Sequence, residues 1–235
     1  GFGVVAAFLE AGARVAVNGR SDASVAAAMH SLGDSGSLVA APGDVGTLDG
    51  CEAAASAAID AMGGLDILVN SAGVGHFRNI EDCDEALWDE TMDINLKGTF
   101  FCCRAAVPAL RTSKGNIVNI ASDAGLMGTA GLSVYCASKG GVVNMTKALA
   151  LELAPEIRVN CVCPGFVDTD MVRRDHIDQA DNPSASEQEL IDFAPLKRIA
   201  TPAEIAQAVL YLAAPDTRFV TGAALQIDGG TTAGR

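Results

Sequence analysis

The stretch Asp66-Ile-Leu-Val-Asn-Ser-Ala-Gly73 decides the fold. Its run Ile67-Leu68-Val69 is continuously apolar and lacks the polar alternation of a strand with one face in water. Such a run is typical of a parallel sheet that is covered by helices on both faces. The Ser-Ala-Gly turn follows the carboxyl end of this strand, and open α/β sheets bind ligands at that edge.

Short apolar runs alternate with longer Ala-rich helical patterns on both sides of this strand. The alternation predicts a doubly wound α/β fold with a parallel sheet and helices on both faces. The expected strands cover residues 14–18, 38–41, 66–70, 116–121, 158–162 and 224–227. The expected helices cover residues 22–32, 47–62, 134–154 and 202–213, with two more between residues 84 and 111. The long acidic connection over about 166–200 breaks this rhythm and is expected to form a substrate lid.

The composition favours one domain over residues 1–235 and argues against several classes of protein. Hydrophobic residues make up 49% of the 235 residues and charged residues 19%, so the chain can build a core. The net charge of −13 repels phosphate backbones and anionic lipids, which argues against nucleic-acid and membrane partners. The longest uncharged run, residues 124–138, is too short to span a bilayer.

Seven cysteines lie mostly inside apolar stretches, and their number is odd. We interpret them as small buried side chains in a reducing compartment, the cytoplasm. Cys161-Val-Cys163 has no second pair at zinc spacing, and the three histidines are scattered, so no metal site is expected.

One motif has the form Y-x-x-x-K, in Tyr135-Cys-Ala-Ser-Lys139. The i, i+4 spacing puts Tyr135 and Lys139 on one helical face, where the ammonium favours phenolate and suits the tyrosine to acid–base work. Alone the motif is weak, because such pairs are common on helix surfaces. Ser122 strengthens it by following a predicted strand end, and Asn95, a mediocre helix former, stands inside a predicted helix.

With these motifs the chain resembles the short-chain dehydrogenase/reductase family over nearly its whole length. The matching segments, in family order and spacing, are Gly43-Asp44-Val45, Asn70–Gly73, Asn95-Leu96, Ile117–Ser122, Tyr135–Lys139, Arg158–Asn160, Pro164-Gly165 and Asp228–Gly230. The resemblance implies one Rossmann-type dinucleotide-binding oxidoreductase domain with strand order 3-2-1-4-5-6-7. It also implies a catalytic tetrad of Asn95, Ser122, Tyr135 and Lys139.

The resemblance assigns each tetrad residue a role. Ser122 would hydrogen-bond the substrate oxygen, and Tyr135 would exchange a proton with that oxygen. Lys139 would lower the pKa of Tyr135 and bind the nicotinamide ribose. Asn95 would hold a water that links Lys139 to solvent, while the hydride belongs to the cofactor.

The cofactor preference depends on the end of the strand 14–18. Family members that select NAD carry an acidic residue there, whereas this chain has Gly19 followed by Arg20 and Ser21. A guanidinium can pair with the 2′-phosphate of NADP(H), and no carboxylate repels it. This favours NADP(H) over NAD(H), although a solvated loop arginine in an NAD enzyme would look the same.

The resemblance supplies the other cofactor residues. Asp44 would take the adenine amino group with Val45 against the ring, or Asp44 is a plain turn residue. The residues expected to line the cofactor elsewhere are Asn70, Ala72, Gly73, Pro164, Gly165, Val167 and Thr169, with Tyr135 and Lys139. The chain departs mildly from the family pattern, with Ser71 and Ala121 where Asn and Ser are usual.

The family's phosphate-binding turn, T-G-x-x-x-G-x-G, is represented here only by its end. Gly1 stands eleven residues before Gly12, which is the family spacing for the final glycine of the turn. Gly3 is then expected to pack the first helix on the sheet. The sequence has no counterpart of the first, mid-sheet strand or of most of the turn, so an upstream segment of about 10–25 residues is expected.

These features predict an NADP(H)-dependent alcohol dehydrogenase or carbonyl reductase with a small-molecule substrate. The alternatives are a 3-oxoacyl-carrier-protein reductase, an NAD-dependent sugar or polyol dehydrogenase, and a non-catalytic dinucleotide-binding module. The acidic lid argues against an acidic carrier protein. The cations that could dock one are Arg111, Lys114, Arg173, Arg174 and Lys197.

Several further expectations concern the pocket and the assembly. The resemblance suggests a homotetramer built from residues 98–111 and 134–154 and the C-terminal strand. The expected pocket neighbours are Met127, Leu132 and Met171 as an apolar wall and His76 as a residue that could touch substrate. Trp88 and the Phe100-Phe101 pair are expected in the core or an interface.

Overall fold

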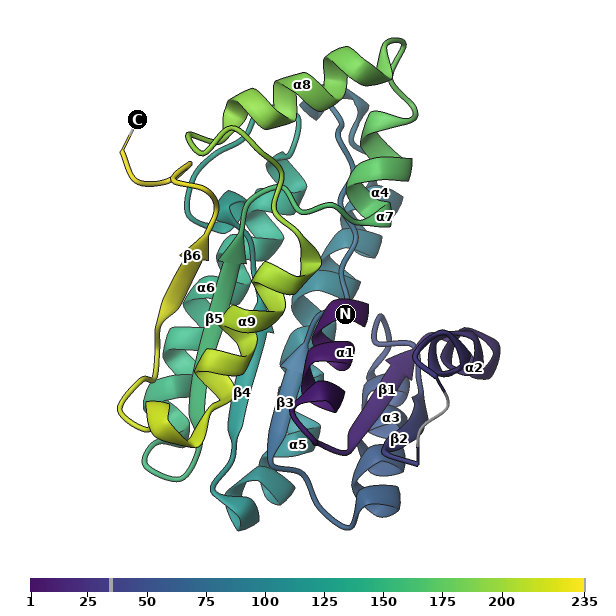
Figure 1. Ribbon diagram of the computed structural model, residues 1–235, viewed down its shortest axis with the longest axis vertical. Coiled ribbons are helices and arrows are strands. Elements are labelled where there is room, and N and C mark those ends of the chain that lie inside the picture. Colours follow the sequence, from purple (N-terminus) through teal and green to yellow (C-terminus); the bar gives the residue numbers. More distant parts are fainter. Residues whose placement is uncertain (34–35, 235) are drawn as a thin grey trace.

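The computed structural model describes residues 1–33 and 36–234. Within these ranges, parallel strands form the centre and helices cover both faces, as predicted (Figure 1). The strands are β1 (Val15–Gly19), β2 (Leu38–Pro42), β3 (Ile67–Asn70), β4 (Asn116–Ile120), β5 (Arg158–Pro164) and β6 (Ala224–Ile227). Each predicted strand forms, and only its ends shift by one or two residues.

The strands pair in two ladders. One joins β1 to β2, and the other runs β3-β4-β5-β6, with every pairing parallel. These neighbours agree with the expected order 3-2-1-4-5-6-7, which places its first strand between β1 and β3. The described residues form no ladder at that place.

The helices begin where capping residues stand. Ser21, Thr47, Asp84, Asn182 and Thr201 each accept a backbone N–H bond at a helix start, which satisfies an otherwise unpaired donor. The helices are α1 (Phe2–Glu10), α2 (Asp22–Ser31), α3 (Leu48–Met62), α4 (Glu85–Met92), α5 (Thr99–Ser113), α6 (Ser133–Leu153), α7 (Asp170–Val172), α8 (Pro183–Phe193) and α9 (Pro202–Ala213).

The core has two layers because both faces of the central strands are covered. Val118 and Val162 contribute to one buried cluster with residues of α1 and α9. Ile117 and Val159 contribute to another with residues of α5 and α6. Neighbouring residues of a strand face opposite ways, so both must be apolar here, which explains the continuous apolar strands.

The predicted helical region between residues 84 and 111 contains a widened π-helical turn. This turn spans Asp93–Gly98 and joins α4 to α5. Such turns are frequent at functional sites. It carries Asn95, which is fully buried, and the Asn95 carbonyl accepts a bond from Thr99 Oγ1 at 2.7 Å.

The segment 166–200, which the sequence predicts to be a substrate lid and which is called the lid from here on, is largely helical and lies over one end of the sheet (Figure 1). It contains α7, a π-helical turn at Arg173–Ile177 and α8. Its two ends are joined, because Asp168 N donates to Ala200 O at 2.8 Å and Ala200 N to Phe166 O at 3.0 Å. Arg173 pairs with Asp168 and with Glu187 of α8, which ties the lid to its own base.

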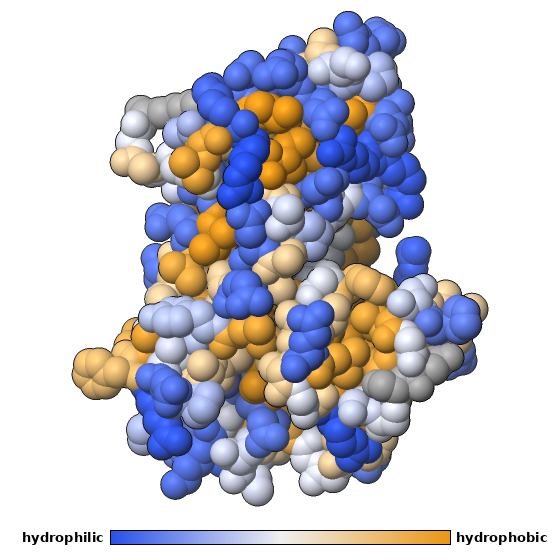
Figure 2. Space-filling model, in the orientation of Figure 1, coloured by the Kyte–Doolittle hydropathy of each residue, from blue (hydrophilic) through white to orange (hydrophobic). Residues whose placement is uncertain are grey.

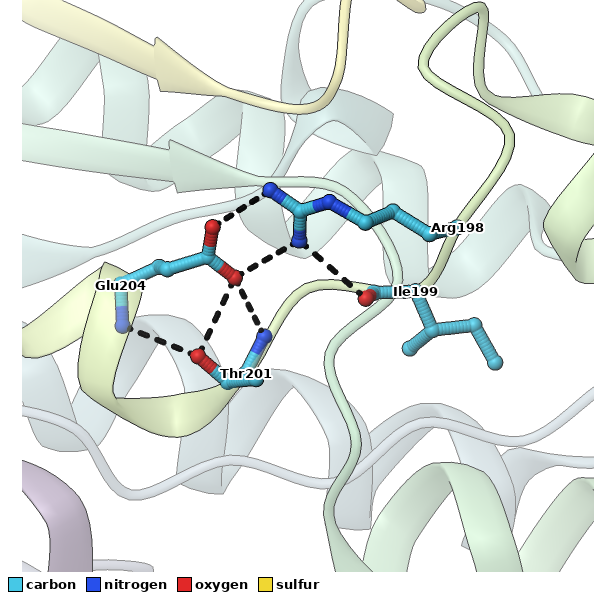
Figure 3. A network of polar contacts seen from close by, with 4 residues as sticks. All are labelled: Arg198, Ile199, Thr201 and Glu204. Atoms are coloured by element: carbon cyan, nitrogen blue, oxygen red, sulfur yellow. Dashed lines mark hydrogen bonds and ion pairs between the residues drawn. The ribbon is translucent and has the colours of Figure 1, made fainter.

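The end of the lid is anchored to α9 by the network in Figure 3. The Arg198 guanidinium donates to both carboxylate oxygens of Glu204, at 2.8 and 2.5 Å. Glu204 also accepts from Thr201 N at 2.8 Å, which completes a capping box at the start of α9. This network sets the start of α9, where Pro202 and Ile205 reach the main cavity.

Some smaller expectations turn out differently. A Cβ on Gly3 would lie 3.0 Å from Pro202 Cβ, so Gly3 packs α1 on α9 and not on the sheet. Trp88 and Phe100 are 47% and 42% exposed, so of the two expected places, core or interface, only an interface remains for them. All seven cysteines are free thiols, although Cys83, Cys102 and Cys136 are only partly buried.

Among the described residues, 1–33 and 36–234, no helix is long and apolar enough to cross a membrane. No group of three or more His, Cys, Asp or Glu side chains within the same ranges could hold a metal ion.

Candidate active site

A cavity of about 820 Å³ lies at the carboxyl ends of the strands, under the lid. This is the edge at which open α/β sheets bind ligands, and the volume is that of a small-molecule site. In Figure 2 the lid end of the molecule presents a mostly hydrophilic outer surface around an apolar patch. Ser122, Tyr135 and Lys139 all line the cavity, so the structure brings together three of the four predicted tetrad residues.

Ser122 follows β4 by two residues and caps a short 3-10 turn over Asp123–Gly125. Its hydroxyl donates to Asp123 Oδ1 at 3.0 Å and accepts from Ala124 N at 3.2 Å. Ala124 N also donates to Asp123 Oδ1 at 2.7 Å. Burial raises the pKa of Asp123 above its usual value, and the bonds from Ser122 and Ala124 oppose that rise.

Tyr135 and Lys139 lie one helical turn apart near the start of α6, as the Y-x-x-x-K spacing predicts. Lys139 is buried, and its Nζ donates to Ile120 O at 2.8 Å. The same Nζ lies 5.7 Å from the centroid of the Tyr135 ring. Burial lowers the pKa of Lys139 to about 8, because it penalises the ammonium.

Burial also governs the pKa of Tyr135. Burial raises it to about 12, and a hydrogen bond with Ser122 opposes this rise. The charge of Asp123 raises it further. Burial penalises phenolate more than its polar neighbours stabilise it, and Lys139 Nζ directs one of its three N–H groups to the Ile120 carbonyl.

Asn95 lies behind the cavity wall and does not line it. Its Oδ1 accepts from Val74 N at 2.8 Å, and its Nδ2 donates to Val74 O at 2.9 Å and to Ser138 Oγ at 3.1 Å. The side chain therefore ties the segment after β3 to α6. A Cβ on Gly73 would lie 3.3 Å from Asn95 Oδ1 and 3.4 Å from Lys139 Nζ, so both polar groups flank Gly73.

The predicted cofactor residues fall into two groups. Those that line the cavity are Gly1, Ala72, Gly73, Pro164, Gly165, Val167 and Thr169, with Tyr135 and Lys139. Those that lie outside it, at or just after the carboxyl ends of β1, β2 and β3, are Arg20, Ser21, Asp44, Val45 and Asn70. These residues lie at strand carboxyl ends, as the cavity does, because β1 pairs with β2 and β3 with β4 in parallel ladders.

The residues outside the cavity differ in how free they are. Arg20 is exposed and makes no ion pair with a described residue. Ser21 caps α2 by accepting from Ser24 N. Asp44 Oδ1 accepts from Gly46 N at 3.0 Å, as a turn residue does. The Asn70 side-chain nitrogen donates to Asn119 Oδ1 at 2.9 Å and to Cys103 Sγ at 3.2 Å, so its two N–H groups point into the fold.

The cavity suits a dinucleotide. Gly1 is the N-cap of the nine-residue helix α1 and offers no side-chain cap, so amides at this helix end stay open to an anion such as a phosphate. Glycines also line the cavity at Gly73 and Gly165. A Cβ on Gly165 would lie 3.1 Å from Asp228 Cα, so a side chain there would have to displace backbone.

The structure also brings in residues that the sequence did not single out. Asp123 was detectable in principle, because it directly follows Ser122 at a strand end. Phe77 and His176 were not, since they meet only through tertiary packing, with ring centroids 4.3 Å apart. Of the expected apolar wall, Leu132 and Met171 line the cavity and Met127 does not.

His76 does not line the cavity either. Its Nε2 lies 3.1 Å from Glu90 Oε2, and both side chains are partly exposed. This placement gives no support to the expectation that His76 touches substrate.

Comparison with known proteins places this arrangement among dehydrogenases and reductases. A family model described as enoyl-(acyl carrier protein) reductase matches residues 1–232. The 2-(S)-hydroxypropyl-CoM dehydrogenase 3 of Xanthobacter autotrophicus is 38% identical over 99% of this chain and 92% of its own length. The 3-oxoacyl-(acyl-carrier-protein) reductase FabG of Chlamydia muridarum is 36% identical, over 98% and 92%. The structure of ElxO with NADP bound has a TM-score of 0.90 and 27% identity, over 99% and 94%.

Proposed function

The chain belongs to the short-chain dehydrogenase/reductase family and is an NAD(P)-dependent oxidoreductase, and we propose that it interconverts a small-molecule alcohol and its ketone with NADP(H). One observation carries the proposal: the hydroxyls of Ser122 and Tyr135 and the ammonium of Lys139 line one cavity at the carboxyl end of β4. A hydrogen-bond donor, a proton carrier and a cation are the groups that carbonyl reduction needs beside the reacting atom.

Each residue then has a stated task. Ser122 Oγ holds the substrate oxygen close to the Tyr135 hydroxyl, which gives its proton to that oxygen in reduction and takes it back in oxidation. Lys139 Nζ stabilises the charge left on Tyr135. Asn95 keeps the segment at Gly73 in register with Lys139 and serves the proton path to solvent. NADP(H), when bound, supplies or accepts the hydride.

The preference for NADP(H) rests on Arg20. This guanidinium is exposed beyond β1 and makes no ion pair with a described residue, so it is available to a 2′-phosphate. A related structure, ElxO, holds NADP. The direct test follows NADPH and NADH absorbance over a panel of ketones, sugars and polyols. Faster turnover of ketones with NADPH supports the proposal, whereas preferred turnover of polyols with NAD would replace it.

A carrier-protein substrate is the second candidate, because a curated relative is a 3-oxoacyl-(acyl-carrier-protein) reductase. Its docking cations are weakly supported. Arg173 is held by Asp168 and Glu187, and Lys197 lies 3.4 Å from Asp192 Oδ1. Arg111 and Lys114 are exposed at the end of α5. Comparing a 3-oxoacyl group on carrier protein with the same group on a small thiol decides between the candidates.

We also propose a homotetramer, as the family resemblance suggests. A shallow apolar groove between α4, α5 and α6 includes Leu96, Phe100 and Met145, and a helical face of this kind favours association between copies. The mass in solution, measured by light scattering for the parent chain and for Phe100→Glu, tests this. A monomeric parent chain would refute it. The free thiols of this chain support the expectation of a reducing compartment, the cytoplasm.

A further inference from the structure

The lid end of the cavity has an aromatic and apolar wall. Phe77, Leu132, Met171 and His176 line it together with Phe193. The rings of Phe77 and His176 stack at 4.3 Å with planes 24° apart. Phe166 and Phe193 meet edge to face at 5.6 Å. Stacked and edge-to-face rings are the surfaces that bind flat apolar groups best.

The segment after β3 connects this wall to the reacting hydroxyl. A Cβ on Gly73 would lie 3.4 Å from Lys139 Nζ, and a Cβ on Gly75 would lie 3.3 Å from the Tyr135 ring and 3.7 Å from Met171 Sδ. Two residues further, Phe77 stacks on His176. Along this segment Gly73 thus lies beside Lys139, Gly75 beside Tyr135, and Phe77 beside His176 of the lid. Gly75 therefore lies between the Tyr135 ring and Met171, the first residue of the apolar wall.

The floor beside Ser122 carries an uncompensated carboxylate. Asp123 lines the cavity, accepts bonds from Ser122 and Ala124, and makes no ion pair with a described residue. Arg173 of the lid does not line the cavity and is paired with Asp168 and Glu187. A carboxylate bonded to the reacting carbon would meet Asp123, while the cation that lines the same cavity, Lys139, donates to Ile120 O. Like charges that face each other in a closed site repel, which gives specificity by exclusion.

We propose that the substrate is an uncharged aryl ketone or aryl carbinol, and that Asp123 excludes 2-oxo and 2-hydroxy acids. The aromatic ring lies against the Phe77–His176 stack and Met171, with the carbonyl oxygen at Ser122. This assignment of a substrate class rests on the oxidoreductase function proposed above. Asp123 acts as a specificity-determining residue, since it touches the substituent next to the reacting carbon.

The test uses matched probes with the full chain in the presence of NADP⁺. Benzoylformate and its methyl ester share the ring and ketone and differ by one charge, while 2-butanone lacks the ring. Binding is measured by saturation-transfer NMR titration, independently of turnover. The ester is expected to bind at least about tenfold more tightly than the acid. In Asp123→Asn the ratio of the two dissociation constants, acid over ester, should fall to less than about threefold, because the amide carries no charge.

The aromatic wall is tested with Phe77→Ala. This substitution should weaken binding of the ester by about threefold to tenfold and leave binding of 2-butanone unchanged. Leu151→Ala, at a position of α6 that is 85% exposed, is the control and should change neither. Thermal melting of each variant verifies folding. If Asp123→Asn fails to fold, Asp123→Ser replaces it.

The outcomes separate the two proposals. Equal binding of acid and ester, or no binding of the ester, overturns the substrate assignment whether or not the protein turns over other compounds. The expected binding pattern without any NADPH oxidation leaves the substrate assignment standing and overturns the proposed reaction.

Discussion

The Ser122 hydroxyl donates its proton to the Asp123 carboxylate across 3.0 Å. A serine whose proton is held in this way can accept a bond from a substrate alcohol but must release Asp123 to donate to a ketone. The bond to Asp123 therefore favours binding of the alcohol over binding of the ketone in the proposed reaction. Burial raises the pKa of Asp123, so its charge is costly in the folded state.

Asp123→Asn is expected to stabilise the fold at neutral pH. A carboxyl whose folded pKa lies above its unfolded value binds more protons when folded, so the parent chain loses stability as pH rises through that range. The amide does not titrate, so the advantage of the variant should grow as pH rises above about 4 and level off once Asp123 is ionised in the folded chain. Melting temperatures of both proteins across this range give the answer. A constant difference at every pH would contradict it.

Tyr135→Phe removes the hydroxyl that we assign as the proton carrier. Turnover should fall by at least about a hundredfold, the scale of general acid–base catalysis, while NADPH binding stays within about twofold. Steady-state kinetics and NADPH fluorescence titration measure the two effects. Tyr211→Phe, at a position of α9 that is 53% exposed, is the matched control and should leave both unchanged. Near-normal turnover of Tyr135→Phe would remove the assigned role.

Lys139→Met exchanges a buried ammonium for a neutral side chain of similar length. Burial lowers the pKa of Lys139 to about 8, so below that pH the folded chain carries a charge that the unfolded chain holds more easily. We expect Lys139→Met to be inactive yet more stable at pH 7 by about 1–3 kcal/mol, less the cost of the unpaired Ile120 carbonyl. Its advantage should shrink between about pH 8 and about pH 10 as the parent lysine deprotonates. Urea unfolding of both proteins at each pH measures this difference in the free energy of unfolding. A difference that does not change with pH would contradict the prediction.

Asn95→Ala cuts the bonds that tie the segment after β3 to α6. The loss leaves the N–H and C=O of Val74 without these partners, so stability should fall by about 2–4 kcal/mol. Asn79→Ala, at an exposed position that makes no side-chain cap bond, should cost less than about 0.5 kcal/mol. Chemical unfolding of both variants compares them directly. Similar costs for the two substitutions would show that the buried amide does not hold this segment.

Arg20→Glu tests the cofactor preference. Exchanging a cation for a carboxylate should weaken binding of NADPH by about tenfold to a hundredfold, because the carboxylate repels the 2′-phosphate. Binding of NADH should change by less than about threefold. Arg14→Glu, at the other end of the strand that leads to Arg20, is the charge-matched control and should not distinguish the cofactors. Dissociation constants for both nucleotides decide the matter. An equal loss for NADPH and NADH would exclude a 2′-phosphate contact by Arg20.

The sequence by itself was sufficient for the strands, most helices and the Tyr135–Lys139 face. These depend on local patterns: apolar runs between turn residues, capping residues such as Thr201, and an i, i+4 spacing that holds in any helix. Ser122 was likewise found from its place after a strand, because strand ends share one edge of a parallel sheet.

Only the tertiary structure decided how these residues are surrounded. The bonds from Asn95 to Ser138 and the stack of Phe77 on His176 join segments that are distant in the chain. No local pattern encodes such contacts, because they depend on how helices and the lid pack over the sheet. Burial has the same origin, and it moves the pKa of Tyr135 up and that of Lys139 down. Sequence patterns predict which side chains lie at the same edge of the sheet. Their contacts depend on packing, and their protonation depends on how far packing removes them from water.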